Sequence, residues 1–452
     1  MDLKGKPFYL SDEDIAWVED TLASMTLEEK VGQLFCVTDT ITDVEELQAF
    51  VKKYHPGGFM YRCGDALEIQ NAQRAMQEAS RIPLLLACNL ESGGNGVATT
   101  GTFFGREMEV AATGETEQAR RLGVVCAREG AAAGCNWAFS PIVDIDYNWR
   151  NPITNVRTFG SDPDTVIEMS KAFMDGVRET GVDLAVTIKH FPGDGVDERD
   201  QHLLSTVNSL SAEEWETTYG RVYRELIDHG AQAVMVGHIL QPAMTRRLCP
   251  GIRDEDILPG STNKYLMTDL LRGELGFNGL ITTDATPMVG FTGTLTRRQA
   301  IAHAIMGGAD VVVFCKNTQE DMDGVREDIE SGVISLERVD DAIRRQLALK
   351  ASLHLHIKHR DGTIVPGPEA LPAIGCEEHT RWAAECADKA ITLVKDNQSL
   401  LPLSPDKTRR VRLTVLGENQ AGAFGDNGGG GPPLKAAPGR GGVGGGMYRY
   451  GA

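Results

Sequence analysis

The chain has 452 residues, of which 41% are apolar and 24% are charged, a composition that excludes general disorder and suits one large domain with a smaller part appended. The net charge of −19 and the isoelectric point near 5.0 argue against nucleic acid or an anionic membrane as the main partner, because both would repel the protein.

The first residues, MDLKGKPFYLSDEDIAW, lack the apolar core of a signal peptide, and no apolar run approaches the roughly 20 residues that span a bilayer. We therefore expect a cytoplasmic protein with no membrane partner and no nucleic-acid partner. Nine cysteines are dispersed without a CxxC pair, which favours reduced, buried thiols over disulfides or zinc ligands. We expect no metal and no cofactor.

The N-terminal segment predicts helices before the first strand. One helix begins near Ser11, and the following MTLEEKVGQLF holds Thr26 and Glu29 at the spacing of a capping box. Both features are structural signals and carry no chemistry.

Short apolar, β-rich runs then recur between stretches with helical spacing, such as TVIEMSKAFMDGVRETG and NKYLMTDLLRGELGF. The eight runs are VGQLFCVT (31–38), GGFMY (57–61), PLLLACN (83–89), NWAFSPIVDI (136–145), LAVTIKHF (184–191), AVMVGHI (233–239), GLITTD (279–284) and VVVFC (311–315). Hydrophobic strands that alternate with helices indicate a parallel sheet covered by helices, and this number of repeats predicts an α/β fold, a closed (β/α)8 barrel of the TIM type. An open, doubly wound sheet is the alternative.

The barrel domain is predicted to span residues 10–355. A Gly- and Pro-bearing linker (356–375) precedes residues 376–424, which we interpret as the incomplete, truncated start of a second α/β domain. Residues 425–452 form a low-complexity, Gly-rich tail that we expect to be disordered.

Barrels of this type carry the active site at the C-terminal ends of their strands, so polar residues should gather there. The strand ends of this chain supply Asn89 and Glu91 after the third run, Asp144 and Asp146 at the fourth, Lys189 and His190 at the fifth, His238 at the sixth and Asp284 at the seventh. We expect these side chains to meet on one rim.

Two features point to acid/base and nucleophilic chemistry. Asp284 directly follows a buried run, where a carboxylate is costly unless it is hydrogen-bonded or takes part in a reaction. His202 lies two residues after Asp200, so the carboxylate can bind one ring nitrogen and raise the proton affinity of the histidine into the range useful near neutral pH. Taken in isolation, Asp284 could instead cap the following turn, and His202 could be a surface histidine in a polar loop.

Several motifs together resemble one family. The segment K-H-F-P-G-x-G-x4-D-x-H at 189–202 looks like the acid/base loop of bacterial β-N-acetylglucosaminidases of glycoside hydrolase family 3. LLRGELGFNGLITTDATPM (270–288) is similar to the nucleophile segment of that family, and RNPITNVRTFGSDP (150–163) resembles its substrate-binding turn. With MTLEEKVGQLF and the Glu91-Ser92-Gly93-Gly94 region, the resemblance covers roughly residues 10–355.

The resemblance implies that Asp284 is the nucleophile of a retaining glycosidase and forms a covalent glycosyl intermediate. His202, held by Asp200, would be first the general acid and then the general base. The implied sugar contacts are Lys189, His190 and Arg157, and the strand-end position of His238 adds it to the candidates for substrate binding.

The acid/base loop also carries acidic residues without an implied role. Its glycines and proline let the loop fold over the site and move. We expect Asp194, Asp197 and Glu198 to be solvated loop charges.

The chain departs from the family pattern after its third run. Family members often have Asp-x-Glu-Gly-Gly there, with the Asp gripping a sugar hydroxyl, whereas this chain has Asn89-Leu90-Glu91-Ser92-Gly93-Gly94. A neutral amide binds a hydroxyl more weakly than a carboxylate does. Either Asn89 makes a weaker contact or Glu91 takes over part of the role.

The expected function is that of a retaining exo-acting β-N-acetylhexosaminidase whose substrates are small oligosaccharides or glycosides of the cell-wall or chitin type. Among enzymes, a β-glucosidase and a β-N-acetylglucosaminide phosphorylase are the alternatives. The phosphorylase is considered because a histidine that has given up its proton would not repel an incoming phosphate. A catalytically inactive sugar-binding barrel is the alternative of another class. The sequence leaves the oligomeric state open.

Overall fold

The computed structural model describes residues 1–39, 41, 43–404, 406–407, 410–412 and 447–448. The chain divides into two compact units, Met1–Ala390 and Ile391–Ala452.

The larger unit is built around a ring of parallel strands. These are β1 (Phe35–Asp39), β2 (Gly58–Tyr61), β3 (Leu85–Cys88), β4 (Trp137–Ala138), β5 (Ala185–Phe191), β7 (Ala233–Val236), β9 (Leu280–Thr283) and β10 (Val312–Val313). Their order in the sheet, β10-β1-β2-β3-β4-β5-β7-β9, places each strand beside its successor in the chain. A bridge between Thr282 and Val311 joins β9 to the beginning of β10 and closes the ring. The predicted (β/α)8 barrel is therefore confirmed, and the open sheet is not what forms.

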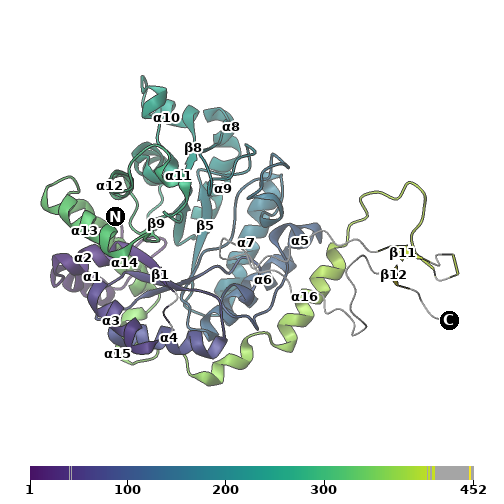
Figure 1. The fold of residues 1–452 in the computed structure, drawn as a ribbon, viewed down its shortest axis with the longest axis horizontal. Coiled ribbons are helices and arrows are strands. Elements are labelled where there is room, and N and C mark those ends of the chain that lie inside the picture. Colours follow the sequence, from purple (N-terminus) through teal and green to yellow (C-terminus); the bar gives the residue numbers. More distant parts are fainter. Residues whose placement is uncertain (40, 42, 405, 408–409, 413–446, 449–452) are drawn as a thin grey trace. The chain divides into compact units, whose positions relative to one another are not determined.

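Helices surround these strands on the outside (Figure 1). Those that follow successive strands are α3 (Val44–Tyr54), α4 (Ala66–Ala79), α6 (Thr116–Ala132), α7 (Pro163–Glu179), α9 (Tyr219–Asp228), the π-helix η5 (Tyr265–Glu274), α12 (Arg297–Gly307) and α13 (Thr318–Glu330). The remaining α-helices are α1 (Asp12–Ala23), α2 (Leu27–Gln33), α5 (Glu107–Ala112), α8 (Ala212–Thr217), α10 (Pro242–Leu248), α11 (Val289–Thr292), α14 (Leu336–Ser352), α15 (Leu355–Arg360) and α16 (Glu377–Ala390).

Short elements lie in the connections. They are the 3₁₀ turns η1 (Gly94–Gly96), η2 (Asn155–Arg157), η3 (Asp254–Asp256), η4 (Gly260–Thr262) and η6 (Pro368–Ala373), and the paired strands β6 (Thr206–Val207) and β8 (Ile239–Leu240). The capping box predicted before α2 is confirmed, because Thr26 Oγ1 accepts the N–H of Glu29 at 3.2 Å and the Glu29 carboxylate accepts the N–H of Thr26 at 3.0 Å.

The strand β4 is shorter than the apolar run 136–145 that predicted it. Pro141 in this run has no N–H for a sheet ladder. The chain nevertheless continues beside β5, because the N–H of Thr187 donates to the carbonyl of Ser140 at 3.0 Å and the N–H of Val143 to that of Lys189 at 2.7 Å. This path brings residue 144 to the same rim as the end of β5.

Helix α16, which we expected to open a second domain, lies in the larger unit and packs against α5 and α6. Its His379 is buried and lies 2.7 Å from the carboxylate of Glu129. The boundary predicted at residue 376 stays a prediction. The predicted tail, 425–452, lies outside the described residues apart from Met447–Tyr448 (β12), which pairs antiparallel with Val411–Arg412 (β11).

Across the described ranges, no helix is both long enough and apolar enough to cross a bilayer. The nine cysteines are free thiols, and Cys63 is exposed while five of the others are buried.

Candidate active site

One side of the barrel rim is a buried ion cluster around Glu91. Its Oε1 lies 2.7 Å from Nζ of Lys189 and 2.9 Å from Nη2 of Arg157, and its Oε2 lies 3.2 Å from Nε of Arg157. Burial raises the pKa of Glu91, but the two cations outweigh this effect and hold that pKa well below its ordinary value. Three of the predicted sugar-binding residues are therefore in direct contact. Asn89 lies half-buried directly after β3, and its contact with sugar stays a prediction.

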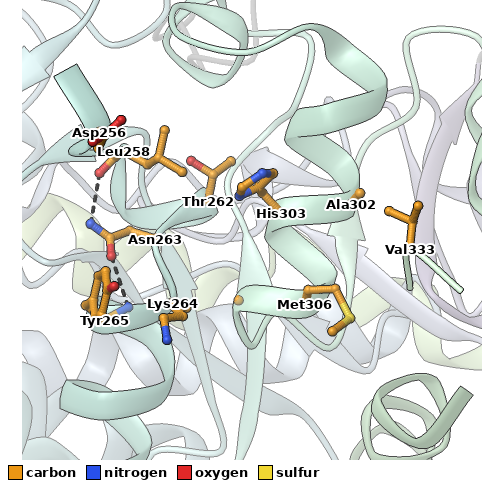
Figure 2. A pocket seen from close by; sticks show the side chains of 11 residues that line it. Asp256, Leu258, Thr262, Asn263, Lys264, Tyr265, Ala302, His303, Met306 and Val333 are labelled. Carbon is orange, nitrogen blue, oxygen red and sulfur yellow. Dashed lines mark hydrogen bonds between the residues drawn. The ribbon is translucent and has the colours of Figure 1, made fainter. Parts of the chain in front are cut away.

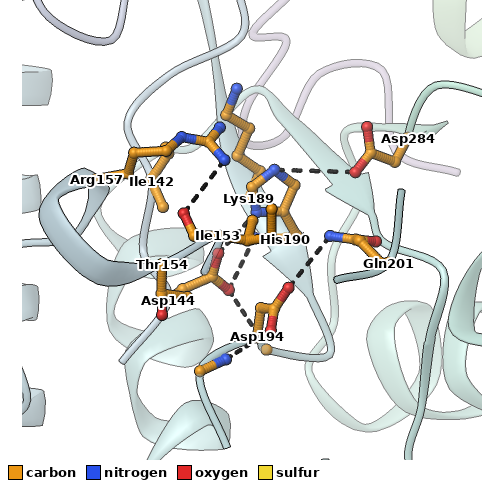
Figure 3. A network of polar contacts seen from close by, with 12 residues as sticks. Ile142, Asp144, Ile153, Thr154, Arg157, Lys189, His190, Asp194, Gln201 and Asp284 are labelled. Atoms are coloured by element: carbon orange, nitrogen blue, oxygen red, sulfur yellow. Dashed lines mark hydrogen bonds and ion pairs between the residues drawn. The ribbon is translucent and has the colours of Figure 1, made fainter. Parts of the chain in front are cut away.

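His190 lies between two carboxylates at the centre of the site (Figure 3). Its Nδ1 is 2.7 Å from Oδ2 of Asp144, and its Nε2 is 3.9 Å from Oδ2 of Asp284. The second oxygen of Asp144 accepts the main-chain N–H of His190 at 3.1 Å. Asp144 was expected at the rim without a role, and the structure shows that it fixes the ring of His190 so that Nε2 faces Asp284.

Asp284 directly follows β9, and its side chain is 13% exposed. Its Oδ1 accepts the N–H of Ala285 at 2.7 Å. Burial raises the pKa of Asp284, whereas the charge of His190 and the N–H of Ala285 lower it, and the net pKa lies below its ordinary value. The site therefore holds an ionised carboxylate at the end of a rigid strand, which is the state that a nucleophile requires.

The spacing of Asp200 and His202 produces the contact that the sequence predicts. Oδ1 of Asp200 lies 2.6 Å from Nδ1 of His202 and also accepts the main-chain N–H of His202 at 2.8 Å. The side chain of His202 is 48% exposed, in contrast to 5% for His190. The carbonyl of His202 accepts the N–H of Val289 at 3.0 Å, so the loop is tied to the segment that follows Asp284.

His238 is fully buried, and protein groups bind both of its ring nitrogens. Nε2 lies 3.0 Å from the carbonyl of Ala285 and Nδ1 lies 2.6 Å from Oγ of Ser261. Because a carbonyl only accepts, Nε2 carries the proton and Nδ1 accepts from the serine hydroxyl. Burial lowers the pKa of His238, in keeping with a neutral ring. This bonding makes His238 a support for the segment that carries Asp284, and it leaves neither nitrogen for the sugar contact that we predicted.

The expectation that Asp194 is a solvated loop charge is wrong. The residue is 1% exposed, and amide groups of Asn151 and Gln201 bind its carboxylate. Burial and the nearby Asp144 raise the pKa of Asp194 to about 7. A G-D-G triplet in a charged loop gives no sign of burial, because one amide partner, Asn151, comes from a distant segment and the loop must fold back for Gln201 to supply the other. Glu198 of the same loop is exposed, as expected.

A separate pocket of about 500 Å³ lies between η4, η5 and α12 (Figure 2). Thr262, His303 and Met306 are among its lining residues. As far as the chain is described, the predicted catalytic and sugar-binding residues do not line this pocket. The candidate active site is therefore the rim around Asp284.

The closed barrel, the ionised carboxylate after β9 and the His–Asp pair on a neighbouring loop are the features of a barrel enzyme that acts on glycosides. Residues 26–349 match the glycosyl hydrolase family 3 N-terminal domain, and the chain belongs to this family. It is accordingly a glycoside hydrolase by family.

Relatives and solved structures carry more than one activity in their names. The chain is 46% identical to a β-N-acetylglucosaminidase/β-glucosidase of Cellulomonas fimi over 92% of this chain and 73% of that protein. It is 48% identical to the β-glucoside phosphorylase BglX, solved bound to 2FGlc, with a TM-score of 0.87 over 90% of this chain and 73% of that one. A family 3 β-N-acetylglucosaminidase from Paenibacillus sp. str. FPU-7 is 27% identical, with a TM-score of 0.72 over 82% and 70% of the two chains.

Proposed function

We propose that the protein is a retaining exo-glycosidase that releases a terminal β-linked sugar, either N-acetylglucosamine or glucose. The observation that carries the proposal is the ionised Asp284, beside a loop whose Asp200–His202 pair is bonded to the segment following Asp284. The names of the relatives support both sugars.

The first half-reaction forms a bond between a carboxylate oxygen of Asp284 and the anomeric carbon while the glycosidic C–O bond breaks. His202 gives the proton on Nε2 to the departing oxygen. Asp200 holds Nδ1, so Nε2 is the nitrogen that transfers the proton. In the second half-reaction, neutral His202 takes a proton from water, the water oxygen bonds to the anomeric carbon, and Asp284 leaves as a carboxylate.

The buried side of the rim binds the sugar in this proposal. Lys189 and Arg157 are held by Glu91, and His190 is held by Asp144, so their donors are in place before the substrate arrives. Preorganised donors of this kind lose little freedom when they bind a sugar hydroxyl.

A second candidate function is phosphorolysis, in which phosphate rather than water takes the sugar from Asp284. The acid/base residue is a histidine, which is neutral at the moment when the acceptor arrives and does not repel an anion. The 48% identity with a β-glucoside phosphorylase supports this candidate.

Aryl β-N-acetylglucosaminide and aryl β-glucoside, assayed side by side with and without phosphate, test both candidates. Release of the aryl group by the wild type, and its loss in Asp284→Asn, is the expected result. A sugar phosphate among the products assigns phosphorolysis, whereas free sugar in the presence of phosphate assigns hydrolysis. No turnover of either glycoside would contradict the proposal and favour a sugar-binding barrel without activity.

A further inference from the structure

The carboxylate of Asp194 lies at a junction of three segments (Figure 3). Its Oδ1 accepts from Nδ2 of Asn151 at 2.9 Å and from the N–H of Gly195 at 2.7 Å. Its Oδ2 accepts from Nε2 of Gln201 at 3.3 Å. Both oxygens of this buried side chain therefore face N–H donors.

Main-chain groups fix the orientation of both amides. Oε1 of Gln201 accepts the main-chain N–H of His238 at 2.8 Å, and Oδ1 of Asn151 accepts the N–H groups of Ile153 and Thr154 at 2.8 and 2.9 Å. A main-chain N–H can only donate, so neither amide can turn its NH₂ group away from Asp194. The position at 194 thus requires an acceptor at both oxygens, which aspartate supplies and asparagine does not.

The Asp194–Gln201 contact lies within the acid/base loop, and Gln201 connects this loop to the nucleophile segment. Gln201 lies between Asp200 and His202 in the chain, and its carbonyl accepts the N–H of Gly290 at 3.1 Å. Its side chain binds His238, whose Nε2–H donates to the residue after Asp284. Gln201 therefore binds Asp194 and the main chain of His238 through its side chain, and Gly290 of the segment after Asp284 through its carbonyl.

Other groups also face Asp194. The N–H of Asp194 donates to Asp144 at 2.8 Å, the Tyr219 hydroxyl donates to the carbonyl of Asp194 at 2.5 Å, and His190 acts on the carboxylate through its charge. Burial and Asp144 raise the pKa of Asp194 to about 7, so an ionised carboxylate is costly here. A residue that is kept ionisable at such a cost is typical of a functional position.

We propose that Asp194 is a positioning residue, whose contact with Gln201 holds the acid/base loop so that His202 faces the glycosidic bond cleaved at Asp284. The inference rests on the proposed role of His202. Asp194 touches neither the sugar nor the reacting atoms in this account, and it acts through Gln201 alone.

The variant Asp194→Asn tests the contact, because its new NH₂ group meets the NH₂ group of Gln201. We expect kcat for a glycoside with a basic leaving group to fall by about tenfold to a hundredfold, with a much smaller change for an activated aryl glycoside and an unchanged KM. Glu198→Gln is the matched control, since it removes one negative charge from an exposed position of the same loop. It should leave both rates unchanged.

A reversed contact separates positioning from general damage to the loop. Gln201→Glu alone places two carboxylates against each other and should behave like Asp194→Asn. In the double variant Asp194→Asn/Gln201→Glu, the new amide can donate to one new carboxylate oxygen while the other still accepts from His238 N–H. We expect this double variant to recover activity to within about threefold of the wild type.

The same assay on His202→Ala distinguishes two kinds of failure. If His202→Ala shows no dependence on the leaving group, the proposed function fails. If His202→Ala shows it but Asp194→Asn does not, or if the double variant recovers nothing, the positioning role of Asp194 is overturned. Melting temperatures are measured for each variant, and Gln201→Glu with the double variant decides the question if Asp194→Asn does not fold.

Discussion

The two sides of the active-site rim are built in different ways. On the sugar side, Lys189 extends from β5 with 4% of its side chain exposed and is bonded to Glu91, which is 13% exposed. On the opposite side, His202 lies on a loop with 48% of its side chain exposed, and Asp200 beside it is 21% exposed. The sugar side is largely buried and ion-paired, whereas the acid/base side is more exposed.

This difference matches the two tasks of the proposed reaction. The sugar must be held in one geometry, which strand ends and a buried ion cluster provide. The acid/base residue must serve a departing group and then an incoming acceptor, which requires access from solvent. A loop can combine access with a defined position only if side-chain contacts such as Asp194–Gln201 hold it.

The largest expected effect comes from Asp284→Asn, at the end of the sugar side. The substitution removes the ionised oxygen that is proposed to form the covalent bond, so kcat should fall at least about a thousandfold. Steady-state kinetics on an aryl glycoside measure the loss, and a circular dichroism spectrum shows that the barrel is intact. Turnover near that of the wild type would rule out Asp284 as the nucleophile.

The next effect comes from His202→Ala, on the acid/base side. Without a general acid, glycosides with basic leaving groups should lose about a hundredfold or more in kcat, and activated aryl glycosides should lose far less. A series of aryl glycosides with different leaving-group pKa values measures this dependence. Equal losses across the series would point to a binding or structural role for His202.

Glu91→Gln tests how strongly the ion cluster stabilises the sugar side. It leaves Arg157 and Lys189 without their buried anion, so the free energy of unfolding should fall by about 3 kcal/mol and KM should rise. Urea unfolding and steady-state kinetics measure the two effects. The control is Glu255→Gln, which breaks the exposed pair with Arg253 and should cost less than about 1 kcal/mol. Equal losses of unfolding free energy in the two variants would show that the cluster around Glu91 stabilises the fold no more than an exposed ion pair does.

A smaller effect on stability is expected from a change of pH, through the titration of Asp194. Asp144, His190 and Tyr219 surround this carboxylate. Its folded-state pKa of about 7 lies above the ordinary value of 3.8, so the folded state binds the proton more tightly than the unfolded state does. Stability gained from this group is present at low pH and is lost as the pH rises through about 7.

Wild type and Asp194→Asn should therefore differ in their pH dependence. Between pH 7.5 and pH 5 the free energy of unfolding of the wild type should rise by about 2 kcal/mol relative to that of the variant. Urea unfolding of both proteins at the two pH values measures this difference. Parallel behaviour would show that Asp194 does not titrate in this range.

The sequence predicted the barrel because hydrophobic runs alternate with helical spacing, and it placed the boundaries of β5 and β9 within a few residues. It overestimated the length of β4, because Pro141 interrupts the regular strand although the chain continues beside β5. The pairing of Asp200 with His202 was predictable because it depends on a local spacing of two residues.

The remainder of the site depends on contacts between distant segments. The ring of His238 is bonded to Ser261 and to Ala285, and the carboxylate of Asp194 is bonded to Asn151. A strand-end histidine and an acidic loop residue look the same in the sequence whether they face solvent or lie buried. The fold alone decides which of the two applies.

The central claim, that Asp284 forms a covalent bond with the sugar, is tested most directly by trapping that bond. A 5-fluoro-β-glycosyl fluoride of the sugar preferred in the aryl glycoside screen forms the intermediate and slows its breakdown. Mass spectrometry of the intact protein and of its peptides should show one added glycosyl group, on the peptide that contains Asp284, and none on the Asp284→Asn variant. A glycosyl group on another residue, or none while the enzyme turns over the aryl glycoside, would contradict the account.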